Sequence, residues 1–283
     1  MAETLGRLVA LSADALSAAG FEDPRRQARR LVASALAITP AYLFGHPNQA
    51  VDEAQTSRVR AILTRVLDHE PLSRILGQRE FWGLPFLLSA ETFDPRPETE
   101  SVVEAVLKRV PDRQVPHRIL DLGTGTGCLL LALLSELPSS TGIGIDIAEG
   151  AVRTAACNAS SLRLSCRAFF IVGDWGRAVS KRFDVIVANP PYIASPDLRL
   201  LPREVACYDP WRALDGGRQG LAAHGAIAAD LPRLLAPDGI FVTEVGAGQV
   251  DAVAGMLKAS GLVFGGIESD LSGTARCVVV RLG

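Results

Sequence analysis

A glycine-rich segment, Asp121-Leu122-Gly123-Thr124-Gly125-Thr126-Gly127, separates an apolar strand pattern from an apolar helix pattern. Its glycines allow a tight turn and a close approach of the backbone to a ligand. The backbone N–H groups at the start of the following helix can then bind polar groups of that ligand. The spacing is G-x-G-x-G after an acidic residue, which differs from the G-x-G-x-x-G of dinucleotide sites. The segment predicts a nucleoside-cofactor site in which all residues from Gly123 to Gly127, Thr124, Gly125 and Thr126 included, contact the cofactor.

Polar and aromatic residues at the ends of the next two predicted strands support this site. Asp146 ends the second strand, where a carboxylate can accept hydrogen bonds from both hydroxyls of a ribose. Asp174 and Trp175 end the third strand, where an acceptor and an aromatic face suit an adenine. A ligand-free glycine turn is the plain alternative, and a nicotinamide dehydrogenase is the second choice of enzyme at this point.

A second motif, Asn189-Pro190-Pro191-Tyr192, follows the fourth predicted strand. The prolines hold the loop extended and stiff, and the carbonyl oxygens of Asn189 and Pro190 can accept both hydrogens of one planar NH₂ group. Tyr192 can stack on a flat amide or base and exclude water. We therefore predict that Asn189, Pro190 and Tyr192 are catalytic, that Pro191 also contacts the substrate, and that Asn189 borders the cofactor as well.

Two acceptors that hold one planar NH₂ group would assist attack by a poor nucleophile. The lone pair of an amide or base nitrogen is delocalised, and no side chain readily removes its proton at neutral pH. Holding both N–H groups lets charge develop on the nitrogen, so orientation and electrostatic stabilisation supply the catalysis and no general base is named. The motif by itself does not choose among adenine, guanine and glutamine, and a proline-stiffened turn is its structural alternative.

Strand and helix patterns that alternate along the chain position both motifs. Apolar strand patterns cover 118–122, 142–146, 168–172, 183–188 and 239–245, and helix patterns cover 129–137, 150–160, 227–235 and 250–260. Two more strands end the series. This alternation predicts a doubly wound α/β sheet with helices on both faces.

The region before this series has a different pattern. Residues 1–76 have helical periodicity, 80–88 predict a β-hairpin, and 99–110 predict an amphipathic helix. We therefore divide the chain into an N-terminal helical bundle over 1–76 for substrate recognition, a β-hairpin linker over 77–93, and a catalytic domain over 94–283.

Composition limits the partners and cofactors. Hydrophobic residues make up 48% and charged residues 21% of the 283 residues, with a net charge of −2. This balance lacks the basic excess typical of general phosphate binding, so we expect no direct nucleic-acid contact. The five cysteines and four histidines are scattered, which predicts reduced thiols and no metal. No apolar run is long enough to cross a bilayer, so we expect a cytoplasmic protein with no membrane association.

Several segments outside the two motifs resemble one known family. They are Glu70–Gly77, Glu80–Phe86, Pro95–Glu100, Asp209–Leu214 with Gly216 and Gly217, and Asp270–Gly273. Together with Asp121–Gly127 and Asn189–Tyr192, and in this order, they resemble the HemK family of protein-(glutamine-N5) methyltransferases. The resemblance covers nearly the whole chain and weakens in the N-terminal helices. The Arg96-Pro97-Glu98-Thr99-Glu100 segment is more similar to the release-factor branch than to the enzymes that act on a ribosomal protein.

The resemblance implies a seven-stranded Rossmann-like domain that uses S-adenosyl-L-methionine and releases S-adenosyl-L-homocysteine. It implies that the substrate is the glutamine of the Gly-Gly-Gln motif of class I peptide chain release factors, and we expect a monomer. Asn189 and Pro190 would hold the glutamine amide beside Tyr192, while the glycine loop, Asp146 and Trp175 would hold the cofactor. The alternatives are a methyltransferase for adenine or guanine in nucleic acid, one for glutamine in a ribosomal protein, and a non-catalytic cofactor-binding adaptor.

Three positions depart from the family pattern. Asp94 stands where an apolar residue is usual, Asp209 replaces a more common glutamate, and Val245 stands where a histidine is frequent. We expect Arg96, Glu98 and Glu100 to form a capping and ion-pair network rather than to take part in catalysis.

Overall fold

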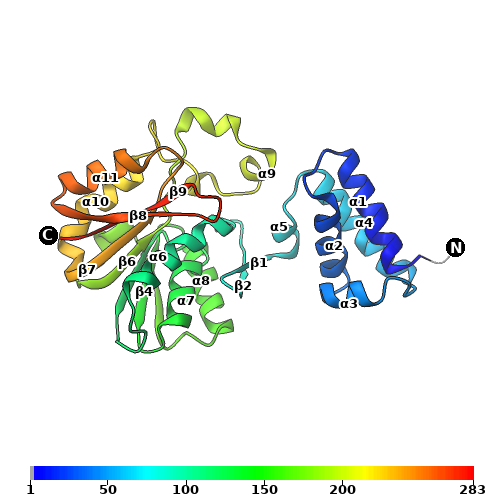
Figure 1. The fold of residues 1–283 in the computed structure, drawn as a ribbon, viewed down its shortest axis with the longest axis horizontal. Helices are drawn as coiled ribbons and strands as arrows, with labels where there is room; N and C mark the ends of the chain where they lie inside the picture. Colours follow the sequence, from blue (N-terminus) through cyan, green and yellow to red (C-terminus); the bar gives the residue numbers. More distant parts are fainter. Residues whose placement is uncertain (1–2) are drawn as a thin grey trace. The chain divides into compact units, whose positions relative to one another are not determined.

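The computed structural model describes residues 3–283, which divide into two compact units, the first ending at Gly77 and the second spanning Gln78–Gly283 (Figure 1). Each unit has a hydrophobic core of its own. Residues such as Leu16 and Leu31 fill the first core, and two larger clusters fill the second unit on either side of a sheet.

The first unit is helical throughout its regular structure. Its helices are α1 (Leu5–Ala18), α2 (Pro24–Ala35), α3 (Pro40–Gly45), α4 (Glu53–Leu67) and α5 (Leu72–Leu76). Helix α4 begins at a capping box, in which the Gln55 backbone N–H donates to the Asp52 carboxylate and the Asp52 N–H donates to the Gln55 side chain. The Thr39 hydroxyl accepts from the Tyr42 N–H at 3.1 Å and caps the start of α3.

A hairpin of β1 (Gln78–Phe81) and β2 (Leu84–Leu87) opens the second unit. Phe81 and Phe86 are fully buried in the core of this unit, with their ring centroids 6.2 Å apart. The side chain of Asn158 bonds both backbone groups of Leu87 and also donates to the Thr126 carbonyl oxygen. The hairpin is therefore fastened to the segment that carries the glycine loop.

A seven-stranded sheet forms the centre of the second unit, which confirms the predicted fold. Its order is β5-β4-β3-β6-β7-β9-β8, in which β9 pairs antiparallel with β7 and β8 and the pairs from β5 to β7 are parallel. The strands are β3 (Arg118–Leu122), β4 (Thr141–Asp146), β5 (Ala168–Val172), β6 (Phe183–Ala188), β7 (Leu235–Glu244), β8 (Leu262–Ser269) and β9 (Ala275–Leu282). The strand order reverses between β3 and β6, which creates a switch point where ligands bind in open α/β sheets.

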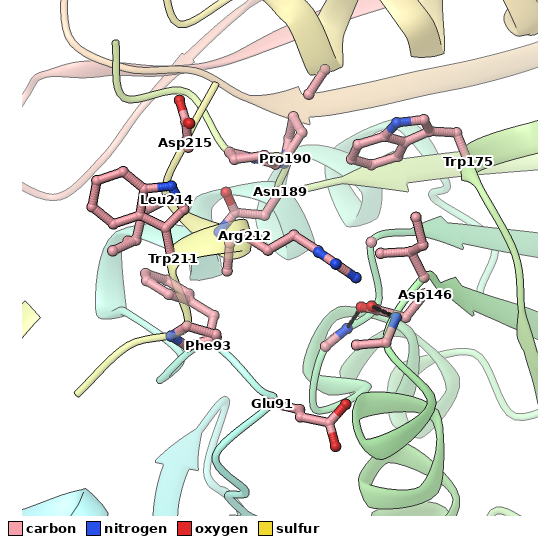
Figure 2. A pocket seen from close by; sticks show the side chains of 18 of the residues that line it. Glu91, Phe93, Asp146, Trp175, Asn189, Pro190, Trp211, Arg212, Leu214 and Asp215 are labelled. Atoms are coloured by element: carbon pink, nitrogen blue, oxygen red, sulfur yellow. Dashed lines mark hydrogen bonds between the residues drawn. The ribbon is translucent and has the colours of Figure 1, made fainter. Parts of the chain in front are cut away.

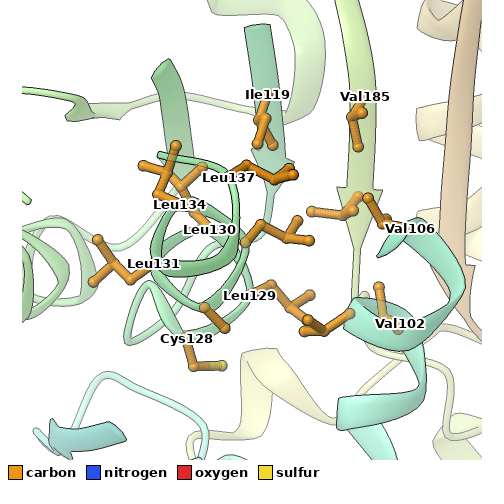
Figure 3. Packing of buried hydrophobic residues seen from close by; sticks show 14 of the residues in the cluster. Val102, Val106, Ile119, Cys128, Leu129, Leu130, Leu131, Leu134, Leu137 and Val185 are labelled. Carbon is orange, nitrogen blue, oxygen red and sulfur yellow. The ribbon is translucent and has the colours of Figure 1, made fainter. Parts of the chain in front are cut away.

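Helices cover both faces of this sheet. The first core cluster holds α6 (Glu100–Arg109) and α7 (Cys128–Glu136), and the second holds α10 (Ala222–Leu234) and α11 (Val250–Ala259). Helix α8 (Glu149–Ser161) follows β4, and a short α9 (Arg203–Ala206) follows β6. Helix α7 is apolar on all sides because it packs on the sheet and also against α6, and Leu129 to Leu134 are all buried (Figure 3).

We expect Leu130→Ala to lower the free energy of unfolding by about 2–5 kcal/mol, because it leaves a cavity in a close-packed core. Leu130 is fully buried, whereas Val115 is 44% exposed, so Val115→Ala serves as the control and should change stability little. Urea denaturation of both variants checks this. Equal stability losses would contradict the described packing of α7.

Candidate active site

A pocket of about 780 Å³ lies at the carboxyl ends of the parallel strands β3 to β6. Residues from four strand ends line it, among them Gly123, Asp146, Trp175 and Asn189 (Figure 2). Its size is that of a small-molecule site, and it lies at the switch point of the sheet. The fold therefore brings the two motifs of the sequence to one cavity.

The glycine loop contributes backbone to the pocket. Gly123 and Gly125 line it, and a Cβ added to Gly123 would lie 3.2 Å from the Trp175 ring. Gly127 is the N-cap of α7 at φ 82°, and the lining does not include it, Thr124 or Thr126. The Thr124 hydroxyl is buried and donates to the Asp121 carboxylate at 2.6 Å. Two of the five residues from Gly123 to Gly127 thus meet the cavity, whereas Thr124 helps to hold the turn in shape.

Asp146 and Trp175 both face the pocket, as does Asp174. The two oxygens of Asp146 each accept one backbone N–H, from Gly125 and from Ala148, both at 2.9 Å. These bonds fix the carboxylate relative to the glycine loop. Asp174 is partly engaged elsewhere, because its carboxylate accepts from the Arg177 guanidinium at 2.7 Å.

All four residues of Asn189 to Tyr192 line the pocket. The Asn189 Nδ2 donates to the Thr99 hydroxyl at 3.0 Å, and no hydrogen bond within residues 3–283 uses its Oδ1. The Tyr192 hydroxyl donates to the Glu244 carboxylate at 3.2 Å. In addition, the Gln249 side chain donates to the Tyr192 carbonyl oxygen at 2.9 Å. The loop is thus held at its side chains and at its backbone.

Two carboxyl groups beneath the pocket are almost fully buried. Burial raises the pKa of Asp121 to about 7, although its hydrogen bond from Thr124 works in the opposite direction. Burial likewise raises the pKa of Glu244 to about 7, against the effect of the nearby Thr99 and Tyr192 hydroxyls. Both groups therefore change charge near neutral pH.

The pocket lining also includes residues that the sequence analysis did not single out as site residues, among them Glu91, Phe93, Trp211 and Arg212. Glu91 accepts from the Gly150 N–H at the start of α8. Burial raises the pKa of Asp146, and the nearby Arg212 guanidinium acts in the opposite direction. Trp211 is 59% exposed. Trp211 and Arg212 belong to a segment quoted for the family resemblance, and this was the only sequence signal for them.

Two of the three positions that depart from the family pattern, Asp94 and Asp209, lie together. Arg96 donates to the Asp209 carboxylate at 2.6 Å, and the other Asp209 oxygen accepts from the Asp94 N–H at 3.2 Å. Arg79 lies 3.6 Å from the Asp94 carboxylate. This buried network connects the segment before α6 to Pro210, which lines the pocket. Val245 is fully buried in the core cluster beside α10 and α11.

Residues 3–283 contain no candidate metal site and no candidate membrane-spanning helix. No cluster of three or more His, Cys, Asp or Glu side chains has the arrangement of a metal site there. None of the helices in this range has the length and apolar character that a membrane span requires.

The fold and the pocket define the class of the protein. Residues 115–264 match the family model described as a methyltransferase domain. The fold is similar to that of the hMettl16 catalytic domain in complex with MAT2A 3'UTR hairpin 6, at a TM-score of 0.56 and 13% identity over 82% of this chain and 83% of that one. It is also similar to a methyltransferase from Pyrococcus furiosus, at a TM-score of 0.54 and 15% identity over 78% and 97%. The chain is a methyltransferase of the class that uses S-adenosylmethionine.

Comparison of the whole chain then gives the family. Residues 8–77 match the PrmC N-terminal domain. The release factor glutamine methyltransferase of Rhodospirillum rubrum is 48% identical over 98% of this chain and 85% of its own length. That of Cereibacter sphaeroides is 41% identical over 94% of both chains. The chain belongs to the release factor glutamine methyltransferase family.

We expect Asp121→Asn to reduce the pH dependence of stability. Because burial raises the pKa of Asp121 from 3.8 to about 7, the folded protein keeps a proton that the unfolded chain releases. The free energy of unfolding therefore falls as pH rises from about 4 to 7, and the variant should show a smaller fall. Urea denaturation at several pH values measures this.

Asp184→Asn is the matched control. Asp184 is paired with Arg118 near the surface and its pKa is lowered. The loss of its charge should therefore not reduce the fall in the free energy of unfolding as pH rises. If Asp121→Asn kept the full pH dependence of the native protein, the carboxyl group would not be the buried titrating group described above.

Proposed function

We propose that this protein transfers a methyl group from S-adenosylmethionine to the side-chain amide nitrogen of the glutamine in the Gly-Gly-Gln motif of class I release factors, and so modulates translation termination. The observation that carries the proposal is the Asn189 amide. Its Nδ2 is committed to Thr99, which leaves Oδ1 as an acceptor in a pocket that the glycine loop also lines. An acceptor at this position suits an N–H donor such as a glutamine amide.

The pocket residues fit the cofactor. Each Asp146 oxygen has used one lone pair on a backbone N–H, so a second remains for a ribose hydroxyl. The Trp175 ring beside Gly123 offers a flat apolar face for an adenine. When bound, S-adenosylmethionine supplies an electrophilic methyl group on a sulfonium. Gly123 and Gly125 would bind its amino-acid end through the backbone.

The acceptor side of the pocket orients the nucleophile. The Oδ1 of Asn189 and the carbonyl oxygen of Pro190 would accept the two hydrogens of the glutamine NH₂ group. Holding both hydrogens favours charge on the nitrogen as its lone pair leaves conjugation, and the methylated amide would lose its extra proton to solvent when it leaves the pocket. Tyr192 borders the same space and keeps water from the amide. No general base is required.

Transfer of labelled methyl from S-adenosylmethionine to a purified class I release factor tests the proposal. A release factor with alanine in place of the Gly-Gly-Gln glutamine is the matched control substrate. The proposal predicts label on the first and none on the second. Label on neither substrate, with transfer to nucleic acid or to a ribosomal protein instead, would overturn it.

We expect Asn189→Ala to lower kcat by about 10²–10³-fold, which is the usual cost of removing one group that stabilises developing charge. Binding of S-adenosylmethionine should stay within about threefold, because Asn189 contributes mainly to the acceptor side. Methyl-transfer kinetics and calorimetric titration of the cofactor measure the two effects. A kcat near that of the native protein would contradict the role of Asn189.

We propose that the helical unit recognises the rest of the release factor. Its core is separate from those of the second unit, so the second unit should fold and bind the cofactor after deletion of residues 1–76. The truncated protein should show a KM for the release factor raised by about tenfold or more, because contacts outside the pocket are lost. Unchanged KM would contradict this role.

A further inference from the structure

Arg212 is a basic residue of the pocket that the proposed function does not use. It supplies the only positive charge among the described residues that line the pocket. The other charged side chains of this lining are acidic, namely those of Glu91, Asp146, Asp174 and Asp215. Figure 2 shows the Arg212 side chain extending across the cavity, with its guanidinium directed toward Asp146.

The backbone around Arg212 is fixed, whereas its guanidinium is not. Before and within the short helical turn, the Ala213 N–H donates to the Pro210 carbonyl oxygen at 2.8 Å. After the turn, the Leu214 carbonyl oxygen accepts from the Ile193 N–H at 3.1 Å, which joins this segment to the loop after β6. The Arg212 side chain is exposed, and within residues 3–283 no hydrogen bond or ion pair engages its guanidinium. The group is therefore available to a ligand of the pocket.

The two pocket-lining residues of the glycine loop have already committed their backbone N–H groups. The Gly123 N–H donates to the Ile145 carbonyl oxygen at 2.9 Å. The Gly125 N–H donates to the Asp146 carboxylate, also at 2.9 Å. These glycines therefore offer a ligand their carbonyl oxygens, which accept hydrogen bonds and suit an ammonium group. The Arg212 guanidinium is directed toward the place where the loop meets Asp146.

S-adenosylmethionine carries charges of both signs. Its ammonium and sulfonium groups are positive, and its carboxylate is negative. The acidic lining and the loop carbonyl oxygens suit the positive groups, whereas a carboxylate is bound best by a charged N–H donor. Among the described lining residues, Arg212 alone has such a donor, and a guanidinium can bind both oxygens of a carboxylate at once.

We propose that Arg212 is a cofactor-binding residue whose guanidinium pairs with the carboxylate of S-adenosylmethionine. The inference rests on the cofactor of the proposed function. It divides the amino-acid end of that cofactor between two segments of the chain, the glycine loop for the ammonium group and the turn Trp211–Ala213 for the carboxylate. Asp146 remains for the ribose. The pocket would thereby select a cofactor that keeps its amino-acid carboxylate.

Two substitutions of Arg212 and one control separate charge pairing from other roles. Arg212→Leu removes the guanidinium, and Arg212→Lys keeps the positive charge but loses the paired N–H groups. Arg218→Leu is the control, because it makes the same change in net charge. Arg218 is exposed on the same segment of the chain and is not part of the lining of this pocket.

Calorimetric titration of the full chain with S-adenosylmethionine and with decarboxylated S-adenosylmethionine gives the readout. The second ligand keeps the adenosine, the sulfonium and the amine, and lacks the carboxylate. We expect Arg212→Leu to raise the Kd for S-adenosylmethionine about 5- to 20-fold, as for a charged hydrogen bond in a partly exposed site. The Kd for the decarboxylated ligand should stay within about twofold of the native value. Arg212→Lys should cause a smaller increase than Arg212→Leu, and Arg218→Leu should keep both native Kd values.

The decarboxylated ligand also reports on folding, because its native Kd requires an intact pocket. An equal increase of both Kd values in Arg212→Leu would overturn the inference, since Arg212 would then act through Asp146 or through the shape of the pocket. A native Kd for S-adenosylmethionine in Arg212→Leu would overturn it as well. If the KM for the release factor rose in that case, the guanidinium would face an acidic group of the release factor instead.

The proposed function fails in a different way. A native protein that binds S-adenosylmethionine through Arg212 but methylates no release-factor glutamine would support this inference and defeat the proposed acceptor. A native protein that binds no S-adenosylmethionine would defeat both.

Discussion

A hydrogen bond of 3.0 Å from Asn189 to Thr99 joins two parts of the chain that are far apart in sequence. Asn189 follows β6, whereas Thr99 lies at the start of α6. The bond leaves the Asn189 oxygen for the pocket, so the acceptor chemistry depends on α6 being held against the sheet. The core shared by α6, α7 and the strands provides that support.

The cofactor side depends on a comparable bond between neighbouring strands. Asp146 at the end of β4 accepts from the Gly125 N–H in the loop after β3. Because these strands are parallel, their carboxyl ends lie at the same edge of the sheet. The register pairs Leu122 with Ile145, just before the glycine loop and the Asp146 carboxylate meet. The glycine loop and the carboxylate are therefore placed by backbone geometry, and the bond between them fixes the local detail.

Much of the sheet could be predicted because buried parallel strands have continuous apolar sequences with turns at both ends. The predicted bounds of 118–122, 168–172 and 183–188 are those of β3, β5 and β6. Strand β7 begins earlier than predicted, at Leu235, because it pairs with Phe183 before an irregularity in register. Pro237 and Gly239 in this stretch break the strand pattern in the sequence.

Site residues could be predicted where a local sequence pattern marks them. Contacts between side chains that are far apart in the sequence could not be predicted. The second motif indicated Asn189, and the ends of two predicted strands indicated Asp146 and Trp175, and all three line one pocket. The hydrogen bond between Asn189 and Thr99 depends on the end of β6 meeting the start of α6, and no local pattern signals it. The same holds for Asp94 and Asp209, whose departures from the family pattern are individually unexplained in the sequence but occur in one ion-pair network.

The central claim is that the pocket presents an oxygen acceptor to the side-chain nitrogen of a glutamine. Tandem mass spectrometry of a release factor, after incubation with the protein and S-adenosylmethionine, locates the transferred methyl group directly. The account predicts a single methyl group on the side-chain amide nitrogen of the Gly-Gly-Gln glutamine. A methyl group on another residue, on a carboxylate oxygen or on the main chain would contradict it.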